Sequence, residues 1–249
     1  MFLRGVEELG SKEERETSNE EGGTRKMENI AANLKKVLAT LPDGVRLVAV
    51  SKFHPVEELR EAYEVGQRIF GESHVQELQR KVTEMPSDVQ WHFIGHLQTN
   101  KVKYLAPYVT MIHAVDSLKL LQEIDRQAAK HDRVIDVLLE LHIAEEATKY
   151  GFSPDNSREL LASGVWRELQ HVRICGLMMM ATYTDDTAQI RREMAMAQQL
   201  FDEFKTDFFA DEDSFKERSW GMSHDYPIAI ETGATFVRIG TTIFGERVY

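Results

Sequence analysis

Short apolar runs alternate with amphipathic helical patterns from Arg46 almost to the end of this 249-residue chain. The first run, Arg46 to Lys52, holds four consecutive apolar residues and follows the turn signal Pro42-Asp43-Gly44. A run of this kind is typical of a strand that is buried on both faces of a parallel sheet. Seven later runs have the same character. The eight predicted strands are Arg46 to Lys52, Arg68 to Glu72, Trp91 to Gly95, Met111 to Val115, Ile135 to Ile143, Ile174 to Met180, Ser219 to Ser223 and Phe236 to Gly240.

Apolar positions three and four residues apart lie between these runs and predict helices. Pro55 and the pair Ser153-Pro154 supply the caps and first-turn prolines with which two of the helices begin. The predicted helices are Val56 to Val65, Val75 to Met85, Asn100 to Ala106, Leu118 to Lys130, Pro154 to Ser163, Ala188 to Phe209 and Asp225 to Glu231. Eight strand-helix units of this size predict a single closed (β/α)8 TIM-type barrel, with a doubly wound open sheet as the alternative.

The segment before the barrel divides into two parts. Residues 1–26 include 12 charged residues and no apolar residue after Leu9. Such a segment cannot bury enough surface to offset the entropy lost on ordering. We therefore expect a disordered charged tail over residues 1–26 and a barrel domain over residues 27–249. The domain begins with a helix, because apolar residues recur at helical spacing from Met27 to Leu41.

Composition excludes several classes of partner. The chain has 41 acidic and 30 basic residues, a formal charge of -11, which disfavours nucleic acid and anionic membrane surfaces. No apolar run approaches the roughly 18 residues of a membrane span, and the start lacks the apolar core of a signal peptide. Its single cysteine, Cys175, permits no intrachain disulfide and fits a reducing compartment. We expect a cytoplasmic protein.

Two cations occupy strand positions where charge is costly. Lys52 ends the first strand, so its ammonium must find an anion, reach solvent, or lose its proton and act as a nucleophile. Arg238 shares one face of the eighth strand with Phe236 and Gly240. If that face lines the barrel, the guanidinium needs an acceptor, either a structural carboxylate or an atom of a ligand, because it stays charged.

Glycine and hydroxyl residues end the seventh and eighth strands, as Gly221-Met222-Ser223 and Gly240-Thr241-Thr242. In a barrel the loops after these two strands commonly bind phosphate, because glycine lets the backbone approach an anion while amides and hydroxyls donate to it. Each loop alone is better explained as a turn or cap. The pair favours a phosphate site that includes Ser223, Gly240 and Thr241.

Other candidate residues carry weaker signals. His92 and His96 flank the third strand without a third ligand nearby, so we expect no metal site. The run Met178 to Met180 fills core gaps or covers a flat ligand, which makes Met178 a candidate contact. A strand-end lysine, a phosphate site and a buried arginine together suggest a phosphorylated aldehyde or ketone held as an imine. Pyridoxal 5'-phosphate satisfies all three.

Six motifs in order resemble the YggS/PROSC-type family of pyridoxal phosphate homeostasis proteins, whose fold is similar to the barrel domain of alanine racemase. The resemblance covers residues 27–249. The motifs are LVAVSK around Lys52, FGESHVQE from Phe70, WHFIGHLQTNK from Trp91, GLMMMA from Gly176, GMSHD from Gly221 and VRIGTTIFG from Val237.

This resemblance implies that Lys52 forms the internal aldimine of pyridoxal phosphate. It also implies that Ser223, Gly240 and Thr241 hold the phosphate and that Arg238 faces the pyridine nitrogen. At Ser73 many members have Asn instead, so Ser73 is a contact with a shorter reach.

The resemblance further implies a role in vitamin B6 homeostasis. The protein holds the cofactor as a lysine imine, delivers it to apo-enzymes, and is a monomer or weak dimer. The alternative is an amino-acid racemase or related Schiff-base enzyme, and a third possibility is a phosphosugar aldolase. Racemisation needs an acid or base on each side of the substrate α-carbon, and the sequence indicates only Lys52. We therefore expect a carrier rather than an enzyme.

Overall fold

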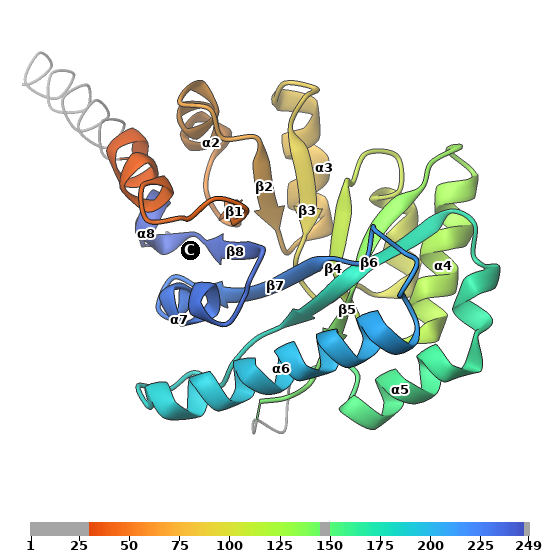
Figure 1. The fold of residues 1–249 in the computed structure, drawn as a ribbon. Helices are drawn as coiled ribbons and strands as arrows, with labels where there is room; N and C mark the ends of the chain where they lie inside the picture. The colour runs from red at the N-terminus through yellow and green to blue at the C-terminus, as the bar shows by residue number, and fades with distance from the viewer. Residues whose placement is uncertain (1–29, 145–149, 247–249) are drawn as a thin grey trace, which may run out of the picture.

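Eight parallel strands close into one barrel in the computed structural model, which describes residues 30–144 and 150–246. Each strand pairs with its neighbours in sequence, and β1 (Arg46–Val50) also pairs with β8 (Phe236–Ile239), which closes the ring. The helices surround the ring of strands (Figure 1). The predicted (β/α)8 barrel is therefore confirmed, and the open sheet is excluded.

The elements follow the predicted order. The remaining strands are β2 (Ile69–Glu72), β3 (Gln90–Phe93), β4 (Met111–Val115), β5 (Ile135–Leu141), β6 (Val172–Met179) and β7 (Glu217–Met222). The α-helices are α2 (Val56–Glu64), α3 (Val75–Glu84), α4 (Leu118–Ala129), α5 (Pro154–Ser163), α6 (Thr187–Asp207), α7 (Tyr226–Glu231) and α8 (Thr241–Phe244). Two short 3-10 helices complete the series, η1 (Thr99–Tyr104) and η2 (Val165–Glu168).

The predicted boundaries differ from the observed ones mainly at the carboxyl ends of the strands. β1 ends at Val50 rather than Lys52, and β7 ends at Met222 rather than Ser223, so both site residues lie in loops. The helix predicted over Asn100 to Ala106 is the 3-10 helix η1, a helix of only six residues. The sequence pattern did not predict η2 or the short helix α8.

Side chains alternate between two cores. Along β8, Val237 and Ile239 pack in the larger core between the strands and the helices, whereas Phe236 packs in the barrel interior. This confirms the predicted division of β8 into two faces. The seven buried apolar residues of the interior are Val48, Met111, Ala114, Leu138, Cys175, Met178 and Phe236. Burial raises the pKa of Cys175 to about 12, so this thiol is a packing residue.

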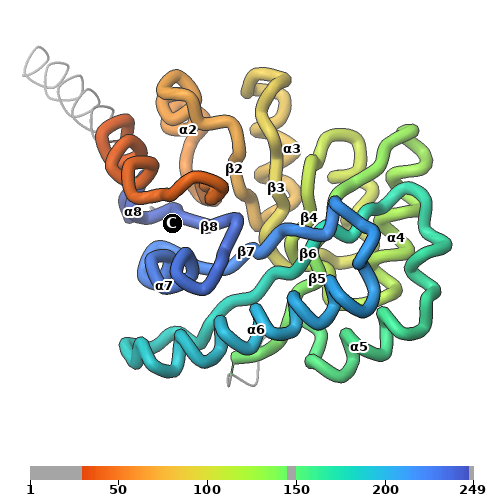
Figure 2. The backbone as a smooth tube through the Cα atoms, in the orientation of Figure 1, coloured from red at the N-terminus to blue at the C-terminus, as the bar shows by residue number. Residues whose placement is uncertain are grey.

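The amino-terminal helix packs beside the end of the barrel. Residues 30–38 are helical, with Ile30, Leu34 and Val37 buried in the outer core. The Asn33 side chain donates to the carbonyl of Ile243 in α8 at 3.3 Å, and both views place this helix beside α8 (Figure 2). The tail predicted over residues 1–26 lies outside the described residues. Within the described ranges, no helix is long and apolar enough to cross a membrane.

Candidate functional site

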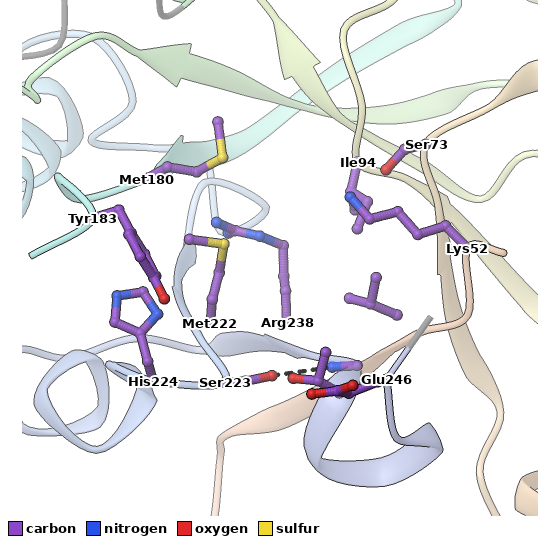
Figure 3. Close-up of a pocket in the computed structure, with 13 residues that line it drawn as sticks. Lys52, Ser73, Ile94, Met180, Tyr183, Met222, Ser223, His224, Arg238 and Glu246 are labelled. Carbon is purple, nitrogen blue, oxygen red and sulfur yellow. Dashed lines mark hydrogen bonds between the residues drawn. The ribbon is translucent and has the colours of Figure 1, made fainter. Parts of the chain in front are cut away.

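A cavity of about 610 Å³ opens at the carboxyl ends of the strands. Six of the seven residues expected from the sequence line it: Lys52, Ser73, Ser223, Arg238, Gly240 and Thr241. They come from the loops after β1, β2 and β7, from β8 and from the start of α8. Figure 3 shows Lys52, Ser73, Ser223 and Arg238 around the cavity. Residues separated by almost 190 positions in the chain therefore face one space because the barrel closes.

Lys52 points into the barrel because of its position relative to β1. Leu47 and Ala49 pack in the outer core and Val48 packs in the interior, so the alternation places Val50 and Lys52 on the inner side. Figure 3 shows the Lys52 side chain reaching into the cavity near Ser73 and Ile94. The lysine is half-buried, so its amine is held within the cavity while remaining accessible to a ligand.

The end of β8 approaches β1 and the turn after β7 closely. A Cβ on Gly240 would lie 2.8 Å from the carbonyl oxygen of Val50, so only glycine permits this approach. The Gly240 amide donates to the Ser223 hydroxyl at 3.4 Å. Asp225 accepts from the Met222 amide at 2.5 Å and holds the turn that carries Ser223. These contacts place a hydroxyl, a backbone amide and the start of α8 around one corner of the cavity.

Arg238 is a buried cation at the floor of the cavity. Its guanidinium donates to the carbonyl of Ser219 at 2.6 Å, to the Ser219 hydroxyl at 2.7 Å and to the carbonyl of Met179 at 2.9 Å. Burial lowers its pKa to about 10, which leaves the group charged at neutral pH. The acceptors are therefore two carbonyls and a hydroxyl, and not the structural carboxylate that was one of the two alternatives.

A chain of hydrogen bonds continues from Arg238 through the barrel interior. Ser219 Oγ lies 2.9 Å from His113 Nδ1, and His113 Nε2 lies 2.9 Å from His92 Nδ1. Burial lowers the pKa of His92 to about 3 and that of His113 well below its ordinary value, so both rings are neutral. Arg238 can only donate hydrogen bonds. Each bond of the chain therefore has one donor and one acceptor when Ser219 donates to His113 and His113 donates to His92. The chain fixes the orientation of Arg238.

Two residues singled out from the sequence, Met178 and His92, do not line the cavity. Met178 does not line the cavity but lies fully buried in the interior cluster beneath it, so this expectation is wrong. Met180, two positions later on the same side of β6, lines the cavity instead, because the site lies beyond the end of the strand. His92 is bonded to His113, and the described part of the chain contains no group of three or more potential metal ligands.

Several cavity residues were not predicted. Ile94, Tyr183, Met222, His224 and Glu246 line the cavity. The rings of Tyr183 and His224 lie 5.0 Å apart, and Figure 3 shows both on the side of the cavity away from Lys52. Met222 is the last residue of β7, and the other four follow a strand or the last short helix, so nearness to the end of an element was the signal that the sequence offered. Barrel closure decides which loop residues turn inward.

Glu140 on β5 has a buried carboxyl group that lies close to Arg238. Desolvation and, to a smaller extent, Asp116 raise its pKa from 4.5 to about 7, although Arg238 opposes part of the rise. One of its oxygens, Oε2, has no hydrogen-bond partner among the described residues. Because the folded pKa exceeds the unfolded value, the protonated carboxyl stabilises the fold below pH 4.5. This contribution is lost as the pH rises through about 7.

We expect Glu140→Gln to reduce the decline in stability between pH 5 and pH 8, by up to about 3 kcal/mol. The amide cannot ionise, so the variant should melt above the parent at pH 8 and close to it at pH 4.5. Thermal unfolding of both proteins across this pH range measures the effect. The exposed Glu159→Gln serves as the control and should follow the parent curve. Parallel curves for Glu140→Gln and parent would contradict the assignment.

Comparisons with known proteins agree on one family. Residues 26–248 match the family model described as the N-terminal domain of alanine racemase. The chain is 42% identical over 205 residues to the pyridoxal phosphate homeostasis protein of Aquifex aeolicus, covering 82% of this chain and 88% of the relative. It is 37% identical over 207 residues to the protein of the same name from Schizosaccharomyces pombe, covering 82% and 85%.

Solved structures show the same relationship. PipY of Synechococcus elongatus, solved without PLP, superposes with a TM-score of 0.81 at 37% identity, covering 87% of this chain and all of that chain. The PLP-bound structure of PipY gives a TM-score of 0.78 at 36% identity, with the same coverage. Alanine racemase of Streptomyces lavendulae, at 17% identity and a TM-score of 0.72, covers 88% of this chain and 57% of its own. At that identity the likeness shows the fold alone.

Proposed function

The chain belongs to the family of pyridoxal phosphate homeostasis proteins, and we propose that it binds pyridoxal 5'-phosphate reversibly in the cavity at the carboxyl ends of its strands. The observation that supports this most directly is the convergence of Lys52, Arg238 and the Ser223 corner on one cavity. Pyridoxal phosphate carries an aldehyde that a primary amine can attack, a ring nitrogen that accepts hydrogen bonds, and a phosphate. The residues present therefore fit the cofactor.

Each part of the cavity takes one part of the ligand. The Ser223 hydroxyl, the backbone at Gly240 and the start of α8 at Thr241 hold the phosphate, where donors to a charged group bind strongly. Lys52 forms the covalent link to the cofactor. Arg238 faces the ring nitrogen and keeps it unprotonated, which weakens the ring as an electron sink. Ser73 lies beside Lys52, and Met180 covers the ring in the role first expected of Met178.

A carrier is favoured over an enzyme by the charge at Arg238. An amino-acid racemase or related Schiff-base enzyme is the second candidate, and one observation supports it. Tyr183 and His224 line the cavity away from Lys52, so groups able to exchange a proton stand on two sides of it. Racemisation requires such groups, and an arginine at the ring nitrogen makes the ring a weaker electron sink than a carboxylate partner would.

The cellular role follows from reversible binding. The protein limits free aldehyde in the cytoplasm and passes the cofactor to apo-enzymes as a monomer or weak dimer. Reversibility is consistent with a site on loops at the open end of the barrel, where a partner can reach the ligand.

The phosphate corner provides the test of cofactor binding. Ser223→Ala and Thr241→Ala should each weaken the affinity for pyridoxal phosphate by about 1 to 3 kcal/mol, the value of a hydrogen bond to a charged group. Equilibrium titration followed by cofactor absorption measures this loss. Pyridoxal, which lacks the phosphate, should bind the parent poorly and lose little more in the variants. Equal affinity of the parent for both compounds would contradict the phosphate assignment.

A further inference from the structure

A second lysine is buried behind the barrel wall, close to Lys52. Lys81 on α3 is 0% exposed, and its ammonium donates to the Ser51 carbonyl at 2.7 Å, Glu72 Oε1 at 2.7 Å and Glu77 Oε1 at 2.8 Å. These three bonds use all the N–H donors of a lysine. Glu72 is also fully buried. Buried ion pairs contribute little net stability compared with apolar packing, so this cluster calls for another explanation.

The bonds of the cluster converge on the two residues that flank Lys52. On one side, the Ser51 carbonyl accepts from Lys81 and the Ser51 hydroxyl donates to Glu72 at 2.6 Å. On the other side, the Phe53 amide donates to Glu77 Oε1 at 2.6 Å. Phe53 has a φ of 68°, a left-handed conformation that is strained for a bulky residue and persists only where its surroundings hold it.

The cluster and the cavity lie on opposite sides of the same wall. Phe70 and Glu72 share the outer side of β2, since Phe70 packs in the outer core and Lys81 reaches Glu72 from helix α3. A Cβ on Gly71, between them, would lie 2.8 Å from the interior residue Val48. Along β1 the same alternation turns Ser51 outward and Lys52 inward. The cluster therefore grips the backbone without entering the cavity.

We propose that Lys81, together with Glu72 and Glu77, is a positioning group for Lys52. It fixes the backbone on both sides of Lys52 from outside the barrel, so that the Lys52 amine is directed into the cavity before a ligand arrives. This inference rests on the proposed function, because the value of the orientation is the rate at which Lys52 attacks an aldehyde. Holding two reacting groups in the right geometry accelerates their reaction strongly.

The charges in the cluster decide how the test is designed. Burial raises the pKa of Glu72 to about 7, and Lys81 opposes that rise. Without Lys81, Glu72 takes up a proton, which limits the cost of leaving a buried carboxylate unpaired. Lys81→Met keeps the length of the side chain and removes the donors. The double variant Lys81→Met/Glu72→Gln removes both buried charges and retains the fold if the single variant does not.

The experiment separates attachment from binding. The rate at which visible absorption appears after mixing with pyridoxal phosphate reports attachment to Lys52. The affinity for pyridoxine 5'-phosphate, which lacks the aldehyde, reports noncovalent binding in the same cavity. In Lys81→Met the attachment rate should fall roughly ten- to a hundredfold. The affinity for pyridoxine phosphate should change by no more than about twofold, because the cluster does not touch the cavity.

Arg80→Met is the matched control, since Arg80 is exposed on the same helix and should leave both measurements unchanged. An unchanged attachment rate in Lys81→Met, or an equal loss of rate and of pyridoxine phosphate affinity, would overturn the positioning role. If the single variant does not fold, the double variant decides by the same criteria. Failure of the parent to bind either compound would instead overturn the proposed function, so the two failures are distinguishable.

Discussion

Lys52→Ala should abolish the visible absorption of bound pyridoxal phosphate while leaving part of the noncovalent binding in place. The amine at Lys52 is the primary amine that the loop after β1 directs into the cavity (Figure 3). The phosphate corner at Ser223 and Gly240 does not depend on it, so the variant should still bind through donors to the phosphate. Borohydride treatment of the loaded parent, followed by peptide mass analysis, should place the cofactor on the peptide that contains Lys52.

Lys119→Ala provides the control, because Lys119 is an exposed residue of α4 remote from the cavity lining. It should retain full absorption and the same labelled peptide. Labelling at another lysine would contradict the site assignment. Incubation with D- and L-alanine then separates the two candidate functions. A carrier shows no substantial racemisation, whereas repeated turnover that disappears in Lys52→Ala would favour the enzyme, with Tyr183 and His224 as the groups to test next.

Gly176→Ala should destabilise the fold by about 3 to 5 kcal/mol, a loss in the exceptional range for one substitution. Gly176 on β6 has a φ of 152°, and a Cβ at this position would lie 1.8 Å from the backbone carbonyl oxygen of Glu217 on β7. The two strands must separate to relieve this contact, because backbone atoms of a paired strand cannot move independently. Urea unfolding followed by far-ultraviolet circular dichroism measures the change.

Gly164→Ala is the matched control for backbone strain without a clash. Gly164 has a φ of 69° at the end of α5, and a Cβ there would meet nothing within 4 Å. The loss of stability in Gly164→Ala should be limited to the cost of placing alanine in the left-handed conformation, about 1 to 2 kcal/mol. Equal losses for the two variants would show that the approach of β6 to β7 does not restrict residue 176.

The order and type of most elements could be predicted from the sequence. Each strand is an apolar run, and in most helices apolar residues recur three or four positions apart. The division of β8 into an inner and an outer face could also be predicted, since alternation is a local property of a strand. It placed Arg238 on the same face as Phe236, and the structure shows that this face is the inner one. Such local patterns do not place one element relative to another.

The depth of a residue along the barrel axis could not be predicted. Met178 in β6 and Met180 just beyond its end lie two positions apart, but only Met180 reaches the cavity. Their levels depend on how far β6 extends before it turns, and on the register shift between β5 and β6 after Val137. Strand register comes from pairing with neighbours far away in the sequence, so a local pattern does not contain it.

By itself, the sequence determined the number and order of the strands, most of the helices, the division of β8 into two faces, the glycine and hydroxyl residues at the ends of β7 and β8, and a lysine at the end of the first apolar run. These follow from the spacing of neighbouring residues. Only the tertiary structure decided which loop residues share the cavity and that a chain of hydrogen bonds runs from Arg238 to His113 and His92. It also decided that Lys81 bonds to the backbone beside Lys52. The physical reason is that these contacts join separate elements, and barrel closure and register set their distances.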